Sequence, residues 1–98
     1  MKKKLMDILA CPECRFEELE LIILKENEEI EEGVIYCSNC KRFYPIIDGI
    51  PVMLPDEIRD GREDIAFLQR WRKTLPKKIT LESVPFNLKL FDTTNNTK

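Results

Sequence analysis

The sequence predicts an α+β fold, with about four short antiparallel strands between a short N-terminal helix and a longer C-terminal one. Three features of the 98-residue chain support this prediction. Two Cys-x2-Cys pairs are separated by 22 residues, and a later segment repeats apolar residues at helical spacing. The third feature is a set of β-prone runs at 19–24, 34–36, 42–47 and 50–54.

The N-terminal part predicts one short helix and one polar connection. Residues 3–10 form the helix, because Leu5, Ile8 and Leu9 fall on one helical face. After the first strand, residues 25–33 are polar and rich in Glu, which predicts a solvated loop or hairpin tip. The second strand then leads directly into the second Cys pair.

The last two strands are predicted to form a hairpin. Asp48-Gly49 separates them, and this dipeptide is a signal for a two-residue hairpin turn. Alternation within these strands places roughly every other apolar residue on each face of the sheet. One set can therefore pack under the sheet, while the other faces a different surface.

The second half of the chain changes from strands to a helix. Asp60 is a candidate N-cap, with Glu63 three residues later, and apolar residues at helical spacing predict a helix over 62–75. Pro76 is expected to end that helix, and residues 79–91 to be extended with a break at Pro85. We therefore expect one domain over 1–91, with the helix as a C-terminal extension, and a disordered tail over 92–98.

The cysteines predict a metal site. Two residues between ligands let the backbone curl around one ion, and the four thiolates Cys11, Cys14, Cys37 and Cys40 complete a tetrahedron. The chain contains no His, so this ligand set leaves no open position and predicts a structural Zn²⁺ in a small zinc ribbon. An iron centre of rubredoxin type and redox-active dithiols are the alternatives. At such sites the free energy of metal binding supplies much of the free energy of folding. The metal-free chain should therefore be largely unfolded over 11–45.

Charge and hydropathy exclude several protein classes. The formal net charge is −2, which argues against a protein that coats nucleic acid. No apolar run approaches the roughly 20 residues of a transmembrane helix. The start, Met1 to Asp7, has the lysines of a signal peptide but not the apolar stretch that must follow, and reduced thiols suit the cytoplasm. We therefore expect a cytoplasmic protein that does not associate with membranes.

Three blocks of the sequence resemble one family. They are Leu-Met-Asp-Ile-Leu-Ala-Cys-Pro-Glu-Cys at 5–14, Tyr-Cys-Ser-Asn-Cys at 36–40, and Phe-Tyr-Pro-Ile-Ile-Asp-Gly-Ile-Pro-Val-Met-Leu at 43–54. Together they resemble the tRNA methyltransferase 112 homologue family of small zinc-ribbon subunits. The short spacing between the Cys pairs is similar to that of archaeal members, and short bacterial zinc-ribbon proteins share the same blocks.

The resemblance implies a non-catalytic role. Members of this family bind and stabilise class I methyltransferases and help them to bind S-adenosylmethionine, which the partner holds. The partners, several of which can compete for one subunit, methylate tRNA, rRNA or a translation release factor, so contact with RNA is indirect. Carried over to this sequence, the resemblance implies a heterodimer with partner-binding residues Pro45, Ile46, Ile47, Gly49, Ile50, Pro51 and Met53.

Two alternatives remain open at this stage. The C-terminal helix can cover the Ile46–Met53 surface internally, leaving no face for a partner. The chain can also be a zinc ribbon that binds RNA or the transcription machinery directly, with Tyr44, Phe67 and Trp71 stacking on bases beside nearby basic residues. Catalysis by this chain alone is not expected, because its strongest nucleophiles are the predicted metal ligands.

Overall fold

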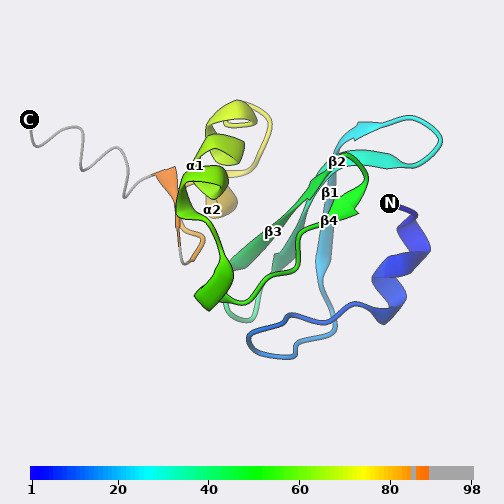
Figure 1. Cartoon of the computed structure of the whole chain (residues 1–98), viewed down its shortest axis with the longest axis horizontal. Helices are drawn as coiled ribbons and strands as arrows, with labels where there is room; N and C mark the ends of the chain where they lie inside the picture. The colour runs from blue at the N-terminus through cyan, green and yellow to red at the C-terminus, as the bar shows by residue number, and fades with distance from the viewer. Residues whose placement is uncertain (85, 89–98) are drawn as a thin grey trace, which may run out of the picture.

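The computed structural model describes residues 1–84 and 86–88, and its backbone forms one antiparallel sheet flanked by short helices (Figure 1). The four strands lie in chain order, β1-β2-β3-β4, which confirms the predicted fold class. The 3₁₀ helix η1 precedes the sheet, and η2, α1 and α2 follow it. The bounds are η1 Lys3–Ile8, β1 Glu20–Glu26, β2 Ile30–Cys37, β3 Arg42–Ile47, β4 Ile50–Pro51, η2 Asp56–Ile58, α1 Gly61–Arg70 and α2 Lys77–Thr80.

The connection predicted over 25–33 is mostly strand. β1 continues to Glu26 and β2 begins at Ile30, so only three residues form the turn. Ile30 is fully buried and Glu32 is 7% exposed, although they lie in the Glu-rich stretch. The predicted hairpin tip is confirmed for residues 25–29, which are exposed around the β1–β2 turn. A solvated loop is wrong for Ile30 and Glu32, because β2 is a central strand covered on both faces and Arg70 of the extension pairs with Glu32.

The predicted hairpin joins β3 to β4, but its second strand is shorter than predicted. β3 and β4 pair antiparallel across Asp48-Gly49, which confirms the predicted hairpin, and both turn residues have positive φ, 51° and 80°, as in a type I′ turn. β4 is only two residues long, whereas a strand over 50–54 was predicted. Beyond Pro51 the chain keeps one further sheet contact, a bond from the Val52 N–H to the carbonyl of Pro45 at 2.8 Å, before it turns towards η2.

Two apolar clusters cover the two faces of the sheet. One contains Val34, Tyr36 and Phe43 from the strands and is closed by the C-terminal extension, through Phe67, Leu68, Leu75, Ile79 and Leu88. The other contains Ile35, Tyr44 and Ile46 and is closed by the N-terminal segment and the cysteines. Figure 1 shows this layering, with α1 and α2 on one side of the strands and η1 on the other.

The N-terminal helix forms as predicted, although its type and its buried face differ. It is a 3₁₀ helix, and Ile8 is 78% exposed, whereas Leu5 and Leu9 pack against the second cluster. Placing Ile8 on the buried face was therefore wrong. The helix ends at Ile8, and Leu9 follows it in extended backbone, so Leu9 reaches the cluster from outside the helix.

The C-terminal helix starts where predicted and ends early. The side chain of Asp60 caps α1 by accepting from the Arg62 N–H at 2.9 Å. α1 stops at Arg70, not at 75, and Leu75 is buried from a turn. Pro76 is the N-cap of α2, so the prediction of extended chain from 79 was wrong for Ile79 and Thr80. Pro85 and the predicted tail 92–98 lie outside the described residues.

Among the described residues, none of the helices has the length and apolar character that a membrane span requires.

Candidate metal centre

Two equivalent backbone turns present the four cysteines. In each, the residue after the second Cys adopts a left-handed conformation, with φ of 69° at Arg15 and 62° at Lys41. In each, that residue also donates its N–H to the carbonyl of the first Cys, at 2.9 Å for Cys11 and 2.8 Å for Cys37. The first turn follows η1, and the second joins β2 to β3. The sheet therefore fixes one knuckle, and the other docks against it.

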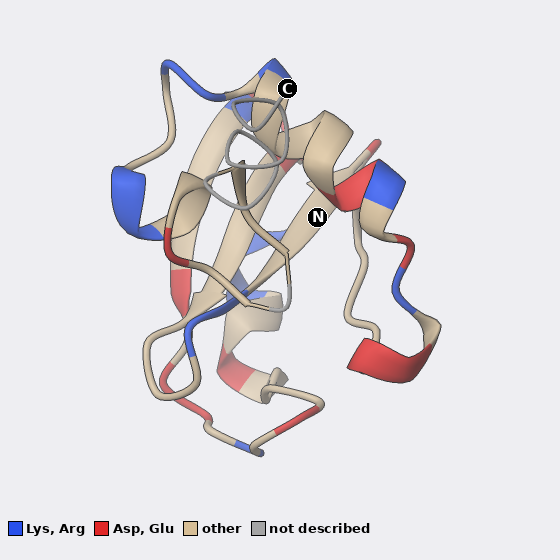
Figure 2. Ribbon diagram, turned by 90° about the vertical axis from the view of Figure 1, so that its left-hand side faces the viewer, with Lys and Arg blue, Asp and Glu red and all other residues tan. Residues whose placement is uncertain are grey.

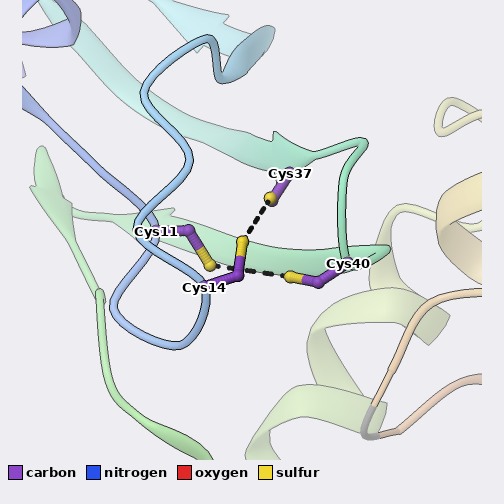
Figure 3. A group of neighbouring side chains, drawn as sticks. All are labelled: Cys11, Cys14, Cys37 and Cys40. Carbon is purple, nitrogen blue, oxygen red and sulfur yellow. Dashed lines mark hydrogen bonds between the residues drawn. The ribbon is translucent and has the colours of Figure 1, made fainter.

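The four sulfurs converge on one point, as Figure 3 shows. All lie within 4.8 Å of one another, and the nearest pairs join the two knuckles: Cys11 to Cys40 at 3.6 Å and Cys14 to Cys37 at 3.5 Å. A tetrahedron with Zn–S bonds of ~2.3 Å has S–S edges of about 3.8 Å. All four are free thiols, so this donor set fits a tetrahedral, thiophilic metal ion, and the structure brings together the four predicted ligands.

A neighbouring side chain and burial shift the pKa values of the cysteine thiols in different directions. Asn39 donates from Nδ2 to Cys14 Sγ at 3.4 Å, and this bond is the main reason that the pKa of Cys14 falls to about 6. Burial raises the pKa of Cys37 to about 12 and also raises the pKa of Cys40. A metal ion must therefore displace protons from Cys37 and Cys40, whereas the lowered pKa of Cys14 favours its thiolate form.

The hydroxyl of Tyr44 contacts the cysteine cluster, and the sequence did not lead us to expect this contact. Its hydroxyl lies 3.1 Å from Cys11 Sγ, and both side chains are fully buried. Burial is the main cause of the raised pKa of this phenol, so it stays protonated and can donate to a thiolate. The only signal in the sequence is strand alternation, which puts Tyr44 and Ile46 on the same face of β3, the face that carries the cysteines.

The metal centre is tied directly to the C-terminal extension. Arg42, two residues after Cys40, pairs with both oxygens of Asp56 at 2.9 and 2.6 Å, and this pairing lowers the pKa of Asp56. Asp56 in turn donates its N–H to Glu13, inside the first knuckle, at 2.7 Å. Val84 donates its N–H to the carbonyl of Lys41 at 2.9 Å. Both knuckles therefore contact the segment that follows the sheet.

The predicted partner-binding residues divide into interior and surface groups. Pro45 and Ile46 are buried, Ile46 completely, within the chain's own core. Ile47 and Ile50 are 39% and 65% exposed at the β3–β4 turn. Partial exposure is seen for the remaining three, Gly49, Pro51 and Met53. The extension does not cover this surface completely, because Ile47 and Ile50 remain exposed although α1 lies beside Ile47 on the same face of the sheet.

The aromatic residues considered for base stacking are mostly unavailable. Tyr44 is fully buried and Phe67 is 6% exposed, with its ring stacked on Phe43 at 6.5 Å between centroids. Trp71 is partly exposed and lies against the Arg70 guanidinium at 5.4 Å. Figure 2 shows acidic and basic positions interspersed along the described ribbon, without a continuous basic stretch in that view.

Comparison with known proteins identifies relatives of the sheet and knuckles. Residues 2–49 match the family described as Trm112p-like protein. A UPF0434 protein of Nitrosococcus oceani is 43% identical over 67 residues, which are 66% of this chain and all of that protein. A tetraacyldisaccharide 4'-kinase of Nitrosomonas eutropha is 48% identical over 59 residues, but these make up only 13% of the kinase.

One solved structure extends these comparisons to a complex. It contains the Trm112 methyltransferase activator of Haloferax volcanii together with a protein assigned as a methyltransferase. The matched chain is 43% identical to this one, with a TM-score of 0.56 over 60% of this chain and all of that one. The two alignments cover 66% and 60% of the present chain, so each leaves about a third or more of it unmatched. The family match, the identity and the shared fold together place this chain in the Trm112p-like family.

Proposed function

We propose that this protein is a non-catalytic, zinc-binding activator subunit of S-adenosylmethionine-dependent methyltransferases that modify tRNA, rRNA or a translation release factor. The observation that carries the proposal is its 43% identity to the Haloferax volcanii activator, aligned along the whole of that chain. In this proposal a class I methyltransferase binds S-adenosylmethionine, the two chains form a heterodimer in the cytoplasm, and several methyltransferases compete for one surface.

The proposed metal is a structural Zn²⁺. Four thiolates without an open position suit zinc and provide no site for a substrate. The ion would hold the first knuckle, which belongs to no strand, against the second knuckle at the end of β2. Residues 1–91 would then behave as one domain. An iron centre offers the same geometry, and colour separates the two because an iron tetrathiolate absorbs visible light and zinc does not.

The proposed docking surface is the β3–β4 turn and its edge. Ile47 and Ile50 are directly paired across the two strands and expose large apolar side chains. β4 is the edge strand, so its outer backbone groups are open to strand addition. Gly49, Pro51 and Met53 complete the surface, while Pro45 and Ile46 support it from the interior.

Direct binding of RNA or of the transcription machinery is the second candidate. A segment similar to this chain also occurs within a protein named as a kinase, so the module is not confined to proteins named as methyltransferase activators. Burial of Tyr44 and Phe67 and a net charge of −2 count against RNA. A direct RNA reader would show affinity that falls steeply with salt, because phosphate contacts release counterions.

Affinity capture from the source organism tests the proposal. The full chain is tagged and recovered with its partners, and mass spectrometry identifies them. The proposal expects one or more class I methyltransferases at close to 1:1 stoichiometry. Recovery of ribosomal or polymerase components without any methyltransferase would overturn it in favour of the second candidate.

A further inference from the structure

A groove lies between the end of β3 and helix α1. Ile47 forms one wall, and Glu63, Ala66, Phe67 and Arg70 form the other, around a volume of about 270 Å³. A smaller cavity of about 40 Å³ adjoins it and shares Ile47 and Glu63. Ala66 is exposed and Ile47 is 39% exposed, so the groove offers accessible apolar surface between the two elements.

The two walls come from different parts of the chain. Ile47 belongs to the region matched to the family, residues 2–49, whereas α1 lies beyond that match. The groove is also continuous with the proposed docking surface, because Ile47 pairs with Ile50 across the β3–β4 turn. A partner seated on Ile50 would therefore reach α1 without crossing a gap. Helix α1 therefore adds a second wall to the proposed docking surface without covering the part that lies within the family match.

The charge at the groove is predominantly negative. Arg59 is paired with Asp64 at 2.9 Å, and Arg70 is paired with Glu32 at 3.1 Å, so both cations are already neutralised. Glu63 is exposed and makes no ion pair among the described residues. Its unneutralised charge attracts a basic side chain and repels phosphate. A protein segment therefore suits this groove better than RNA does.

We infer that the groove receives a segment of the partner methyltransferase in which an apolar side chain lies next to a Lys or Arg. The apolar side chain packs between Ile47 and Ala66, and the basic one pairs with Glu63. This inference rests on the proposed function and adds a specificity element to it. Methyltransferases that carry this pair of side chains are favoured over those that fit only the β3–β4 turn.

Variants on α1 separate this inference from the proposed function. Glu63→Lys reverses the groove's charge, Ala66→Phe fills its apolar part, and Glu18→Lys is the matched control in the loop before β1, where Glu18 is also exposed. The probe is the purified methyltransferase recovered with the unmodified chain, and its Kd is measured by calorimetry at low and high salt. Zinc content and the thermal unfolding midpoint confirm that each variant is folded.

The inference expects Glu63→Lys and Ala66→Phe each to weaken binding about tenfold or more, with the first effect smaller at high salt and Glu18→Lys silent. Reversing the charge of the partner's basic residue should restore the affinity of Glu63→Lys. If both α1 variants bind like the unmodified chain while Ile50→Asp does not bind, the groove inference fails and the proposed function stands. If Ile50→Asp also binds normally, the proposed docking surface fails together with the groove. If no methyltransferase is recovered with the unmodified chain, the proposed function itself fails.

Discussion

The hydroxyl of Tyr44 lies 3.1 Å from the sulfur of Cys11, and both groups are fully buried. Tyr44 is in the middle of β3, whereas Cys11 belongs to the first knuckle, which has no strand of its own. The contact therefore links that knuckle to the sheet. When Cys11 is a metal thiolate, the phenol donates to it and stabilises its negative charge.

Tyr44→Phe should weaken the metal site without unfolding the domain. The change keeps the buried ring and removes only the donor, and a hydrogen bond to a charged group contributes about 1.5–3 kcal/mol. Zinc affinity, measured by competition with a chelator, should fall by roughly 10–100-fold. The sulfur-to-metal charge-transfer band of the Co²⁺ form should move to lower energy. Tyr36→Phe is the control, since Tyr36 lies in the opposite core cluster; an equal loss in both variants would count against the assignment.

Cys37→Ser should abolish high-affinity metal binding and unfold the sheet region. Cys37 ends β2 and is fully buried, so its loss removes a ligand and leaves a hydroxyl in an apolar site. Circular dichroism and metal analysis are the measurements. A variant that keeps native strand content without metal would show that the core alone holds the fold.

Ile50→Asp should leave the metal site and the fold intact and abolish methyltransferase binding. Ile50 is 65% exposed at the β3–β4 turn, so a carboxylate there remains hydrated in the free chain. In a complex, the same carboxylate would be buried without a partner, which costs several kcal/mol. Zinc content and the unfolding midpoint should stay unchanged while methyltransferase binding is lost. If the variant unfolds instead, Ile50 belongs to the core.

Metal removal should loosen the C-terminal extension together with the knuckles. Arg42, Asp56 and Glu13 form a continuous chain of hydrogen bonds between the second knuckle, η2 and the first knuckle. Trp71, the chain's single tryptophan, reports on the extension. Its emission should shift to longer wavelength when a chelator is added, in step with loss of strand signal. An unchanged emission after the sheet has melted would show that the extension folds independently.

Arg59→Met should destabilise the protein by about 3 kcal/mol, because it leaves Asp64 buried and unpaired. Arg59 is nearly buried, pairs with Asp64 at 2.9 Å and stacks on Phe43 and Tyr44 at 4.9 and 5.1 Å. Burial raises the pKa of Asp64 above its ordinary value. A raised carboxyl pKa means that the charged form is the costly one, so the loss should shrink as the pH falls through that pKa.

Denaturant unfolding of Arg59→Met and of Arg59→Met/Asp64→Leu at several pH values measures this effect. The double variant removes both charges and should recover most of the lost stability. It should also lose the pH dependence. A double variant as unstable as Arg59→Met alone would show that the ring contacts of Arg59, and not its charge pair, carry the effect.

The features that local chemistry dictates were predictable. Cysteine spacing indicated that four cysteines would come together, Asp48-Gly49 indicated the hairpin, and Asp60 indicated the start of α1. Each depends on a few adjacent residues whose geometry is nearly fixed. The strands followed from β-branched runs for the same reason, since the pattern records burial and strand propensity together.

The features that depend on distant contacts were not predictable. Glu32 lies in a central strand and not in the solvated part of the hairpin, and its side chain pairs with Arg70, 38 residues away. Leu75 continued the helical spacing but is buried from a turn. The contact between Tyr44 and Cys11 spans 33 residues. In each case the deciding partner is supplied by tertiary packing, which the local pattern does not encode.

The most direct test of the account is methyl transfer by the partner with and without this chain. The methyltransferase recovered by affinity capture is purified alone and as the zinc-loaded complex, and transfer from labelled S-adenosylmethionine to tRNA, rRNA and release factor is measured. An activator role predicts little or no transfer and weak S-adenosylmethionine binding by the methyltransferase alone, and robust transfer and binding by the complex. Equal activity in both preparations would contradict an activator role.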